Sequence, residues 1–344
     1  MEGKDAVREV ARIPVMCAPL RAVKFGLLLP QPELPEVEFS RRLVQKSLAK
    51  KRISAVKVAN DKIVCQVPAG RLKALKGRTV KQCRRWGKQL WFEMDKGPSP
   101  MFHLGMTGSF HVKGRNSLKY VRLKEDDPKT WPPKFWKVEF QMSDGTCFAM
   151  SDPRRFGRIG LSTSVWEEPC MAKMGFDPLL QMPRVEDFAR QLARRSGDIK
   201  AVLLDQSFAA GVGNWVADEV LYQAAVHPQD VAKNLSPNAV KALHRTLRQV
   251  VKKACQVNTD AKKFPRTWLF HYRWELEPFE GGLPADSTTW LELGPVEVKA
   301  PSLRMAKDVK SGFSPLEGAP PPTCPPCNGR RNEEKRQSDE TIFK

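Results

Sequence analysis

The chain has 344 residues, of which 58 are Lys or Arg and 38 are Asp or Glu, so its formal net charge is +20. All of this positive excess lies in residues 32–273, which favours a polyanionic partner, nucleic acid first and an anionic membrane second. No stretch approaches the roughly 20 apolar residues of a membrane span. The eight cysteines are scattered, which argues against a disulfide framework and is typical of a reducing compartment.

Residues 33–51 are predicted to form the first helix. Pro35 falls in its first turn, acidic residues stand near its start, and lysines stand at its end, as the helix dipole prefers. Val37, Val44 and Leu48 fall on one face of this helix, so that face is expected to be buried.

Residues 53–161 are predicted to form antiparallel strands in a sandwich or a barrel. Short β-branched or aromatic runs alternate here with turn residues. Strict alternation over 137–142, the turn 143–146 and a second apolar run predict a hairpin. Residues 115–136, rich in Lys, Asp and Pro, are predicted to be an inserted loop.

The next region is predicted to be helical and the tail disordered. A glycine-rich turn at 210–214 leads into one of these helices, and Ser236 is expected to cap another. Beyond 273 the order fades into a segment rich in Pro, Gly and Ser. The predicted helices are 185–195, 199–206, 215–225 and 237–257.

Pro32 and Glu33 form the first candidate catalytic pair. A proline secondary amine attacks a sugar carbon and forms an imine only if its nitrogen is free, and an adjacent carboxylate can move the protons that this reaction needs. In this chain Pro32 follows Gln31, so its nitrogen is an amide as written.

Several short motifs suit an enzyme that extrudes a base from duplex DNA. Residues 84–88 offer three cations, and N–H groups within 211–214 are expected to grip a phosphate at a helix start. Residues 103–109 and 152–157 place an unbranched apolar side chain, arginines and an aromatic on turns, where they can fill the space that a flipped base leaves.

In this order and spacing, the motifs closely resemble formamidopyrimidine-DNA glycosylases of the Fpg/Nei family, and most of all its plant and algal branch. The resemblance covers roughly residues 32–273. It rests on Pro-Glu-Leu-Pro-Glu-Val-Glu at 32–38, Arg-Trp-Gly-Lys at 85–88, His-Leu-Gly-Met-Thr-Gly at 103–108, Asp-Pro-Arg-Arg-Phe-Gly at 152–157, Ile-Lys at 199–200 and Gly-Val-Gly-Asn at 211–214.

The resemblance implies an α+β fold. Its parts would be an N-terminal extension (1–31), an antiparallel β-sandwich with a flanking helix (32–165), a helical domain with a helix–two-turn–helix element (175–273) and a divergent, disordered tail (274–344). It implies excision of oxidised purines, formamidopyrimidines and 8-oxoguanine, from damaged double-stranded DNA by a proline Schiff base and β,δ-elimination. No cofactor and a monomeric protein are expected.

The resemblance also implies roles for single residues. Pro32 would be the nucleophile, Glu33 the catalytic carboxylate, and Lys88 a further catalytic residue that contacts DNA near the lesion. Glu36 would be a supporting acid. Met106, Arg154 and Phe156 match the intercalating residues. The expected DNA ligands are Lys200 and Asn214 from the resemblance, together with Gly213, Arg85 and Arg155.

Two features depart from the family's pattern. Members begin at this proline, so we expect that residues 1–31 are removed, that the true start lies elsewhere, or that no imine forms. Cys324 and Cys327 make only half of a zinc site, so no metal is expected. The arginine-bearing hairpin that replaces zinc in plant relatives has no assignable residues after Arg273.

Two alternatives remain at this level. One is a non-catalytic protein that binds damaged or abasic DNA without a free amine, and the other is an RNA- or ribosome-binding protein. The basic cluster at 330–336 predicts a nuclear location, with chloroplast and mitochondrion as alternatives.

Overall fold

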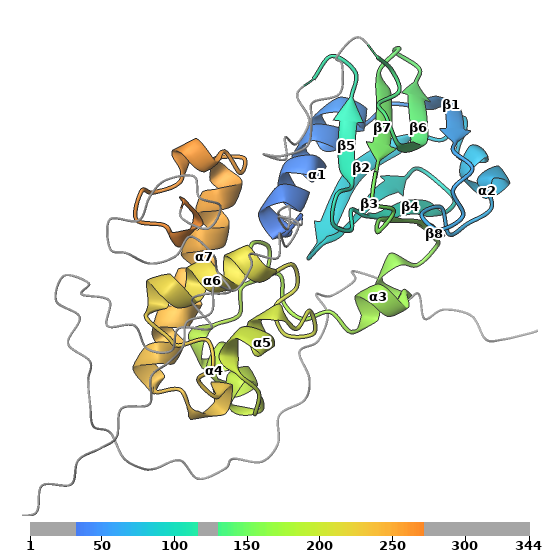
Figure 1. The fold of residues 1–344 in the computed structure, drawn as a ribbon. Coiled ribbons are helices and arrows are strands. Elements are labelled where there is room, and N and C mark those ends of the chain that lie inside the picture. Colours follow the sequence, from blue (N-terminus) through green and yellow to red (C-terminus); the bar gives the residue numbers. More distant parts are fainter. Residues whose placement is uncertain (1–31, 116–129, 272–344) are drawn as a thin grey trace, which may run out of the picture. The chain divides into compact units, whose positions relative to one another are not determined.

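The computed structural model describes residues 32–115 and 130–271, which all fall in one compact unit of the chain (Figure 1). The strands are β1 (Ile53–Val58), β2 (Val80–Trp86), β3 (Gln89–Met94), β4 (Ser99–His103), β5 (Ser109–Val112), β6 (Trp136–Met142), β7 (Cys147–Ser151) and β8 (Arg158–Ser162). The helices are α1 (Leu34–Leu48), α2 (Ala69–Lys73), α3 (Pro169–Ala172), α4 (Val185–Ala193), α5 (Ile199–Leu204), α6 (Asn214–Ala224) and α7 (Pro237–Gln256).

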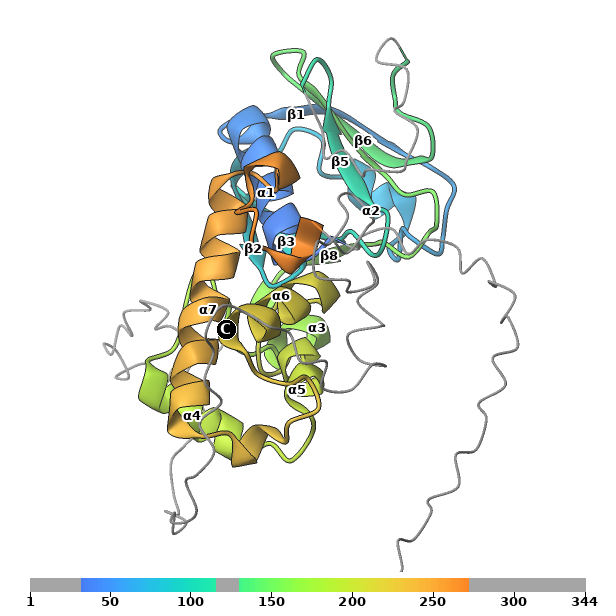
Figure 2. The same cartoon turned by 60° about the vertical axis from the view of Figure 1, so that its left-hand side comes forward.

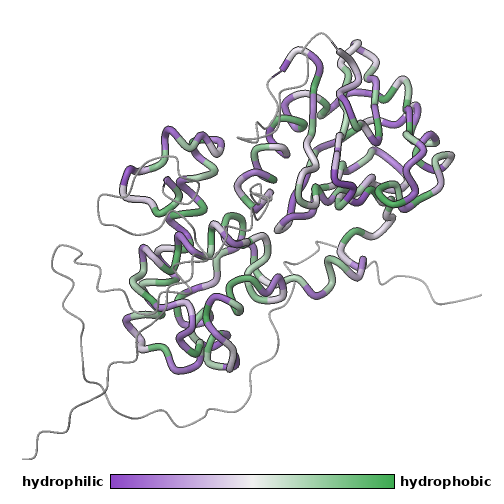
Figure 3. Tube along the Cα trace, viewed as in Figure 1, coloured by the Kyte–Doolittle hydropathy of each residue, from purple (hydrophilic) through white to green (hydrophobic). Residues whose placement is uncertain are grey.

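The strands form two four-stranded antiparallel sheets, in the orders β1–β6–β7–β5 and β2–β3–β4–β8. Aromatic rings join the two sheets: the ring centroid of Phe92 on β3 lies 5.4 Å from that of Phe148 on β7. Phe102 on β4 and Phe110 on β5 are 5.2 Å apart. Apolar residues therefore fill the space between the sheets, and the predicted α+β fold with an antiparallel sandwich is confirmed. Figure 3 shows hydrophobic and hydrophilic residues interspersed along the trace of this part.

The predicted hairpin is present as β6 and β7. The backbone N–H of Met142 donates to the carbonyl of Thr146 at 2.8 Å, and Gly145 adopts the positive φ of 82° that the turn requires. Most of the predicted inserted loop lies at 116–129, outside the described residues.

The first helix ends earlier than predicted. It stops at Leu48, because Ala49 turns to an extended conformation and Lys50 takes a left-handed φ of 65°. The N–H of Lys50 then donates to the carbonyl of Val80, which leads the chain to the sheets instead of into a further helical turn.

The helical part has its own core, in which α6 packs against α7 (Figure 2). The predicted helices appear within three residues of the expected bounds, and α6 begins at Asn214. The hydroxyl of Ser236 accepts a hydrogen bond from the N–H of Ala239 at 3.2 Å, which confirms the predicted cap of α7.

The helix α1 belongs to both cores. Leu34, at its first position, is buried in the core of the helical part, whereas Val37, Val44 and Leu48 are buried in the core of the sandwich. The predicted apolar face is thus confirmed, and the start of α1 is fixed where the two cores meet. The predicted N-terminal extension (1–31) and tail (274–344) lie outside the described residues.

Candidate active site

Glu33, the predicted catalytic carboxylate, is buried with both of its oxygens held by the start of α6. Its Oε1 accepts a hydrogen bond from the backbone N–H of Trp215 at 2.8 Å. Its Oε2 accepts from the N–H groups of Gly213 at 2.9 Å and Val216 at 3.1 Å. The N–H groups at a helix start have no partner within the helix and carry positive charge, so α6 fixes the position of this carboxylate.

This arrangement corrects one prediction. The N–H of Gly213 was expected to bind a DNA phosphate, but it already donates to Glu33. A carboxylate of the same chain occupies the helix start and offsets its positive charge, so this group is not available to a second anion. Asn214, the exposed residue that follows, keeps its side chain at the surface.

Glu36 lies beside Glu33 and holds a proton near neutral pH. Its Oε2 accepts a hydrogen bond from the backbone N–H of Glu33 at 3.0 Å, and the indole nitrogen of Trp215 lies 3.5 Å away. Burial, and then the charge of Glu33, raise the pKa of Glu36 to about 8. Glu36 is therefore mostly protonated at pH 7, beside the carboxylate of Glu33.

Lys88 lies at the tip of the β2–β3 hairpin, which contacts the loop that leads to the start of α6. Trp86 pairs with Gln89, so Gly87 and Lys88 form the turn between them. Gly87 has a φ of +56°, and a methyl group added to it would stand 3.0 Å from Cβ of Ala210. The hairpin tip thus contacts the loop that leads to the start of α6, and only glycine allows this approach.

His103 lies beside this turn as a neutral imidazole. Burial, and then the positive charge of Lys88, lower the pKa of His103 to about 4. Its Nδ1 accepts a hydrogen bond from the N–H of Gly105 at 3.1 Å, so the ring hydrogen is placed on Nε2. The imidazole of His103 therefore adds no positive charge beside Lys88 at pH 7.

The turns that carry Met106, Arg154 and Phe156 are held together by a buried carboxylate. Oδ1 of Asp152 accepts a hydrogen bond from the hydroxyl of Thr107 at 2.7 Å, and Oδ2 accepts one from the N–H of Gly157. Asp152 is 0% exposed, so these bonds compensate a charge withdrawn from water.

Glycine makes the contact between these two turns close. A methyl group on Gly105 would stand 2.4 Å from the backbone carbon of Phe156. Met106 follows Gly105, so the structure places it beside the turn that carries Arg154 and Phe156. The guanidinium carbon of Arg154 lies 5.1 Å from the ring centroid of Phe156, which is 47% exposed. Arg154 and Phe156 therefore form an exposed contact between a cation and an aromatic ring.

Comparisons with known proteins identify the family of this chain. Residues 31–159 match the formamidopyrimidine-DNA glycosylase N-terminal domain, and residues 174–265 match the formamidopyrimidine-DNA glycosylase H2TH domain. A formamidopyrimidine-DNA glycosylase of Arabidopsis thaliana is 39% identical over 244 residues, which span 70% of this chain and 63% of that protein. One from Pelobacter propionicus is 31% identical over 70% of this chain and 85% of its own. The chain belongs to the formamidopyrimidine-DNA glycosylase family.

Solved structures of family members share the fold. Lactococcus lactis Fpg in complex with DNA containing N7-benzyl-Fapy-dG aligns with a TM-score of 0.56 and 26% identity, over 65% of this chain and 79% of that one. The same protein bound non-covalently to DNA with an abasic site aligns with a TM-score of 0.57 and 25% identity, over 67% of this chain and 84% of that one. The resemblance read from the motifs is confirmed, including its plant branch.

Arg85, which was predicted to contact DNA, lies in the interior of this family member. Its side chain is 0% exposed and forms ion pairs with Glu38 at 3.1 Å and Asp177 at 2.5 Å. It also donates to the carbonyl of Gly87 at 2.9 Å. Strand β2 alternates its side chains, so Arg84 faces solvent while Arg85 faces inward. The cation holds the hairpin tip in place and is not available to a phosphate.

Two other predicted DNA ligands are engaged in ion pairs. Arg155 is half-exposed and forms a bidentate pair with Asp61 at 2.9 and 3.0 Å. Nζ of Lys200 lies 2.8 Å from the carboxylate of Asp218. Contact of either cation with DNA remains a prediction, and it would require the side chain to share or leave its carboxylate.

Three buried acids that hold loops in place were not predicted from the sequence. Asp152 joins the two turns, Asp177 accepts from Gly87, and Glu219 accepts from the N–H of Phe270 at 2.9 Å. Asp152 precedes Pro153, and an Asp-Pro pair indicates a turn. Asp177 and Glu219 act on partners about 90 and 51 residues away, and no local pattern marks them.

Within the described residues, no cluster of three or more His, Cys, Asp or Glu could hold a metal. The five described cysteines are free thiols, and Cys324 and Cys327 lie outside this part of the chain. None of the described helices is long and apolar enough to cross a membrane.

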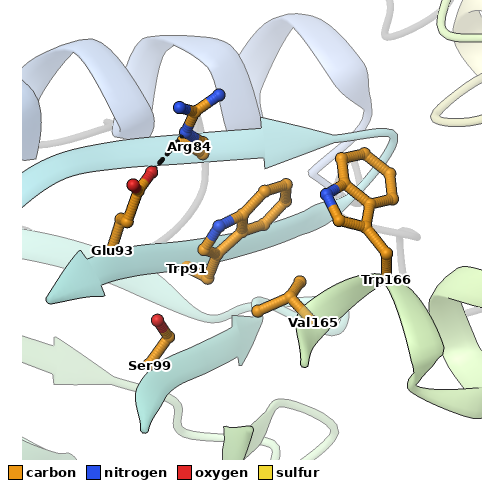
Figure 4. A pocket seen from close by; sticks show the side chains of 6 residues that line it. All are labelled: Arg84, Trp91, Glu93, Ser99, Val165 and Trp166. Atoms are coloured by element: carbon orange, nitrogen blue, oxygen red, sulfur yellow. Dashed lines mark hydrogen bonds and ion pairs between the residues drawn. The ribbon is translucent and has the colours of Figure 1, made fainter. Parts of the chain in front are cut away.

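A shallow hollow of about 300 Å³ opens on the outer face of the second sheet (Figure 4). Trp91 and Trp166 meet edge to face in its wall, and the ion pair of Arg84 and Glu93 borders it. None of the predicted site residues lines this hollow. It therefore belongs to the packing of Trp166 against the sheet and not to the site around Glu33.

The proton on Glu36 makes stability depend on pH. The pKa of Glu36 is about 8 in the folded protein and near 4.5 in the unfolded chain, so the folded state binds more protons between these values. The free energy of unfolding is therefore expected to fall as pH rises through this window, by about 1.4 kcal/mol per unit from this group. Replacing Glu36 with Gln removes the group and flattens that dependence.

Urea unfolding of the full chain at several pH values between 5 and 8 measures this effect. Glu186→Gln, at an exposed position of α4, is the matched control and should keep the slope of the unsubstituted protein. Equal slopes for Glu36→Gln and the unsubstituted protein would show that Glu36 is ionised in the folded state.

Proposed function

We propose that the chain is a DNA glycosylase with AP lyase activity that excises oxidised purines, formamidopyrimidines and 8-oxoguanine, from duplex DNA. The observation that carries the proposal is the carboxylate of Glu33, which follows Pro32 directly and is fixed by three N–H groups at the start of α6. Family membership and relatives solved with damaged or abasic DNA support it.

In the proposed reaction, the free nitrogen of Pro32 attacks C1′ of the damaged nucleotide. The glycosidic bond breaks, and its electron pair leaves with the base. The carboxylate of Glu33 takes the proton that the nitrogen loses and passes it to the ring oxygen, and the sugar ring opens to give an iminium ion. Loss of a proton from C2′ then expels the 3′ phosphate, and a second elimination expels the 5′ phosphate.

The positions of Glu33 and Glu36 suit this sequence of proton transfers. Only a carboxylate whose geometry is fixed can reach the sugar oxygen without first reorganising, and α6 supplies that rigidity. Because Glu36 is protonated near neutral pH, it adds no second negative charge beside the departing base. Lys88, at the hairpin tip, offers a cation to the phosphate next to the lesion.

The two joined turns suit the space that an extruded nucleotide leaves. Phe156 is half-exposed on a turn, and Met106 lies on the neighbouring turn, so both can enter a base stack. Arg154 is exposed and offers hydrogen-bond donors to the unpaired base. Asp152 joins the two turns through the hydroxyl of Thr107 and the N–H of Gly157, so the turns that carry the three side chains lie together.

The chemistry requires that Pro32 have no residue bonded to its nitrogen. A peptide nitrogen shares its lone pair with the carbonyl and is not a nucleophile. We expect protein that begins at Pro32 to be trapped on formamidopyrimidine-containing DNA by borohydride, which reduces the iminium ion to a stable amine. Full-length protein, whose intact Gln31–Pro32 bond is verified by its mass, should give no trapped complex.

Equal trapping by the two forms would place the nucleophile elsewhere and contradict the proposal. The second candidate function, a protein that binds damaged DNA without cutting it, is favoured by the residue in front of Pro32. Such a protein would retard a lesion-containing oligonucleotide in a gel and leave it uncut in both forms.

A further inference from the structure

The helix α7 carries a ridge of four cations, Lys241, Arg245, Arg248 and Lys252. All four are exposed. They follow one another at intervals of four, three and four residues, so at 100° per residue they lie within about 60° of one another on the helix surface. We call these four residues the α7 ridge.

The charge of the α7 ridge is not compensated by its own helix. The sequence of α7 contains no Asp or Glu, and within 32–115 and 130–271 none of the four cations forms an ion pair. Like charges three and four residues apart repel and weaken a helix. The four cations of the ridge therefore lower the stability of α7 and do not contribute to folding.

The α7 ridge faces away from the candidate active site. The opposite side of α7 is apolar and buried, with Leu243, Leu247 and Val250 in the core that also contains α6. The start of α6 holds Glu33, so the body of α7 stands between the ridge and that carboxylate. A duplex segment at Glu33 does not lie on the ridge unless it bends around the helix.

The composition of the exposed face selects the kind of partner. Beside the ridge this face carries Asn238, Gln249 and Gln256, and no large apolar side chain is exposed on it. An amphipathic helix that lies in a membrane surface needs such apolar side chains beside its cations. The rise of 1.5 Å per residue spreads the ridge over about 16 Å, the axial length of about five base pairs.

We infer that the α7 ridge binds the phosphate backbone of a second DNA segment, separate from the segment at Glu33. The contact needs no lesion and reads no sequence, because it consists of cations and phosphates. It would allow one protein molecule to hold two duplex segments at once. The inference goes beyond the proposed excision and does not require it.

The test compares two full-length variants that lose the same charge. One is K241Q/R245Q/R248Q/K252Q, and the control is R71Q/K73Q/K76Q/K81Q, four exposed cations of the sandwich part. Binding of an undamaged duplex of about 30 base pairs is measured from 50 to 200 mM salt. The slope of log K against log salt is expected to become shallower by about 3 to 4 in the ridge variant and to change much less in the control.

A second readout tests for two segments. The unsubstituted protein and the control should capture a labelled duplex on a surface that carries another duplex, and the ridge variant should lose this capture. Equal slopes and equal capture for the two variants would overturn the inference. A preference of the unsubstituted protein for structured RNA over duplex DNA would also overturn it. Tighter DNA binding by the ridge variant would do the same, because the ridge would then bind an acidic segment of its own chain. Excision of a formamidopyrimidine is measured separately with the same substitutions in protein that begins at Pro32, so loss of capture and loss of catalysis are distinguished.

Discussion

Gly213→Ala is expected to slow strand cleavage at a lesion about a hundredfold, because a misplacement of about 1 Å can cost that much. A methyl group at this position would stand 2.4 Å from Cδ and 2.6 Å from Cγ of Glu33. Gly213 has a φ of −128°, which any residue can adopt, so the backbone tolerates alanine. The whole effect therefore falls on Glu33, which must leave the N–H groups that fix it.

Single-turnover cleavage by protein beginning at Pro32 measures this effect, and the affinity for an uncleavable abasic-site analogue is measured beside it. The rate should fall while that affinity changes little, because the N–H of Gly213 binds Glu33 and not DNA. Gly197→Ala is the matched control, since a methyl group there meets nothing within 4 Å. A Gly213→Ala protein that cleaves at the unsubstituted rate would show that the position of Glu33 is not critical.

Asp177→Asn is expected to destabilise the protein by about 3–5 kcal/mol, the usual cost of breaking a buried ion pair on one side. Asp177 and its partner Arg85 are both 0% exposed. Asp177 also accepts hydrogen bonds from the N–H groups of Gly87 at 2.8 Å and Leu179 at 3.0 Å. The amide of Asn cannot offset the guanidinium charge, and its NH₂ group cannot accept these bonds.

The ion pair of Arg84, the residue before Arg85 on β2, with Glu93 on β3 provides the control. Arg84 and Glu93 form an ion pair of 2.6 Å, but their side chains are 51% and 37% exposed. Glu93→Gln should therefore cost less than about 1 kcal/mol. Urea unfolding of the full chain compares the two variants, and similar losses would mean that the Arg85–Asp177 pair contributes no more than a surface contact. In protein that begins at Pro32, the rate of cleavage should also fall in Asp177→Asn, because Gly87 loses the hydrogen bond that supports the turn carrying Lys88.

Local patterns in the sequence were sufficient for the elements and for the family. Apolar spacing placed Val37, Val44 and Leu48 on the buried face of α1, and Ser236 marked the start of α7. These features depend on neighbours within about four residues, and sequence records such neighbours directly. The short motifs likewise identified Glu33, Met106 and Phe156 as candidates before any contact was known.

Tertiary structure alone decided what each candidate does. Alternation along β2 puts Arg84 and Arg85 on opposite faces, but only the approach of Asp177, 92 residues away, makes Arg85 an interior cation and not a DNA ligand. The N–H groups at the start of α6 bind Glu33, 180 residues earlier, in place of a phosphate. The raised pKa of Glu36 has the same origin, because burial and the field of nearby charges depend on all the segments that surround a group, and these are distant in the chain.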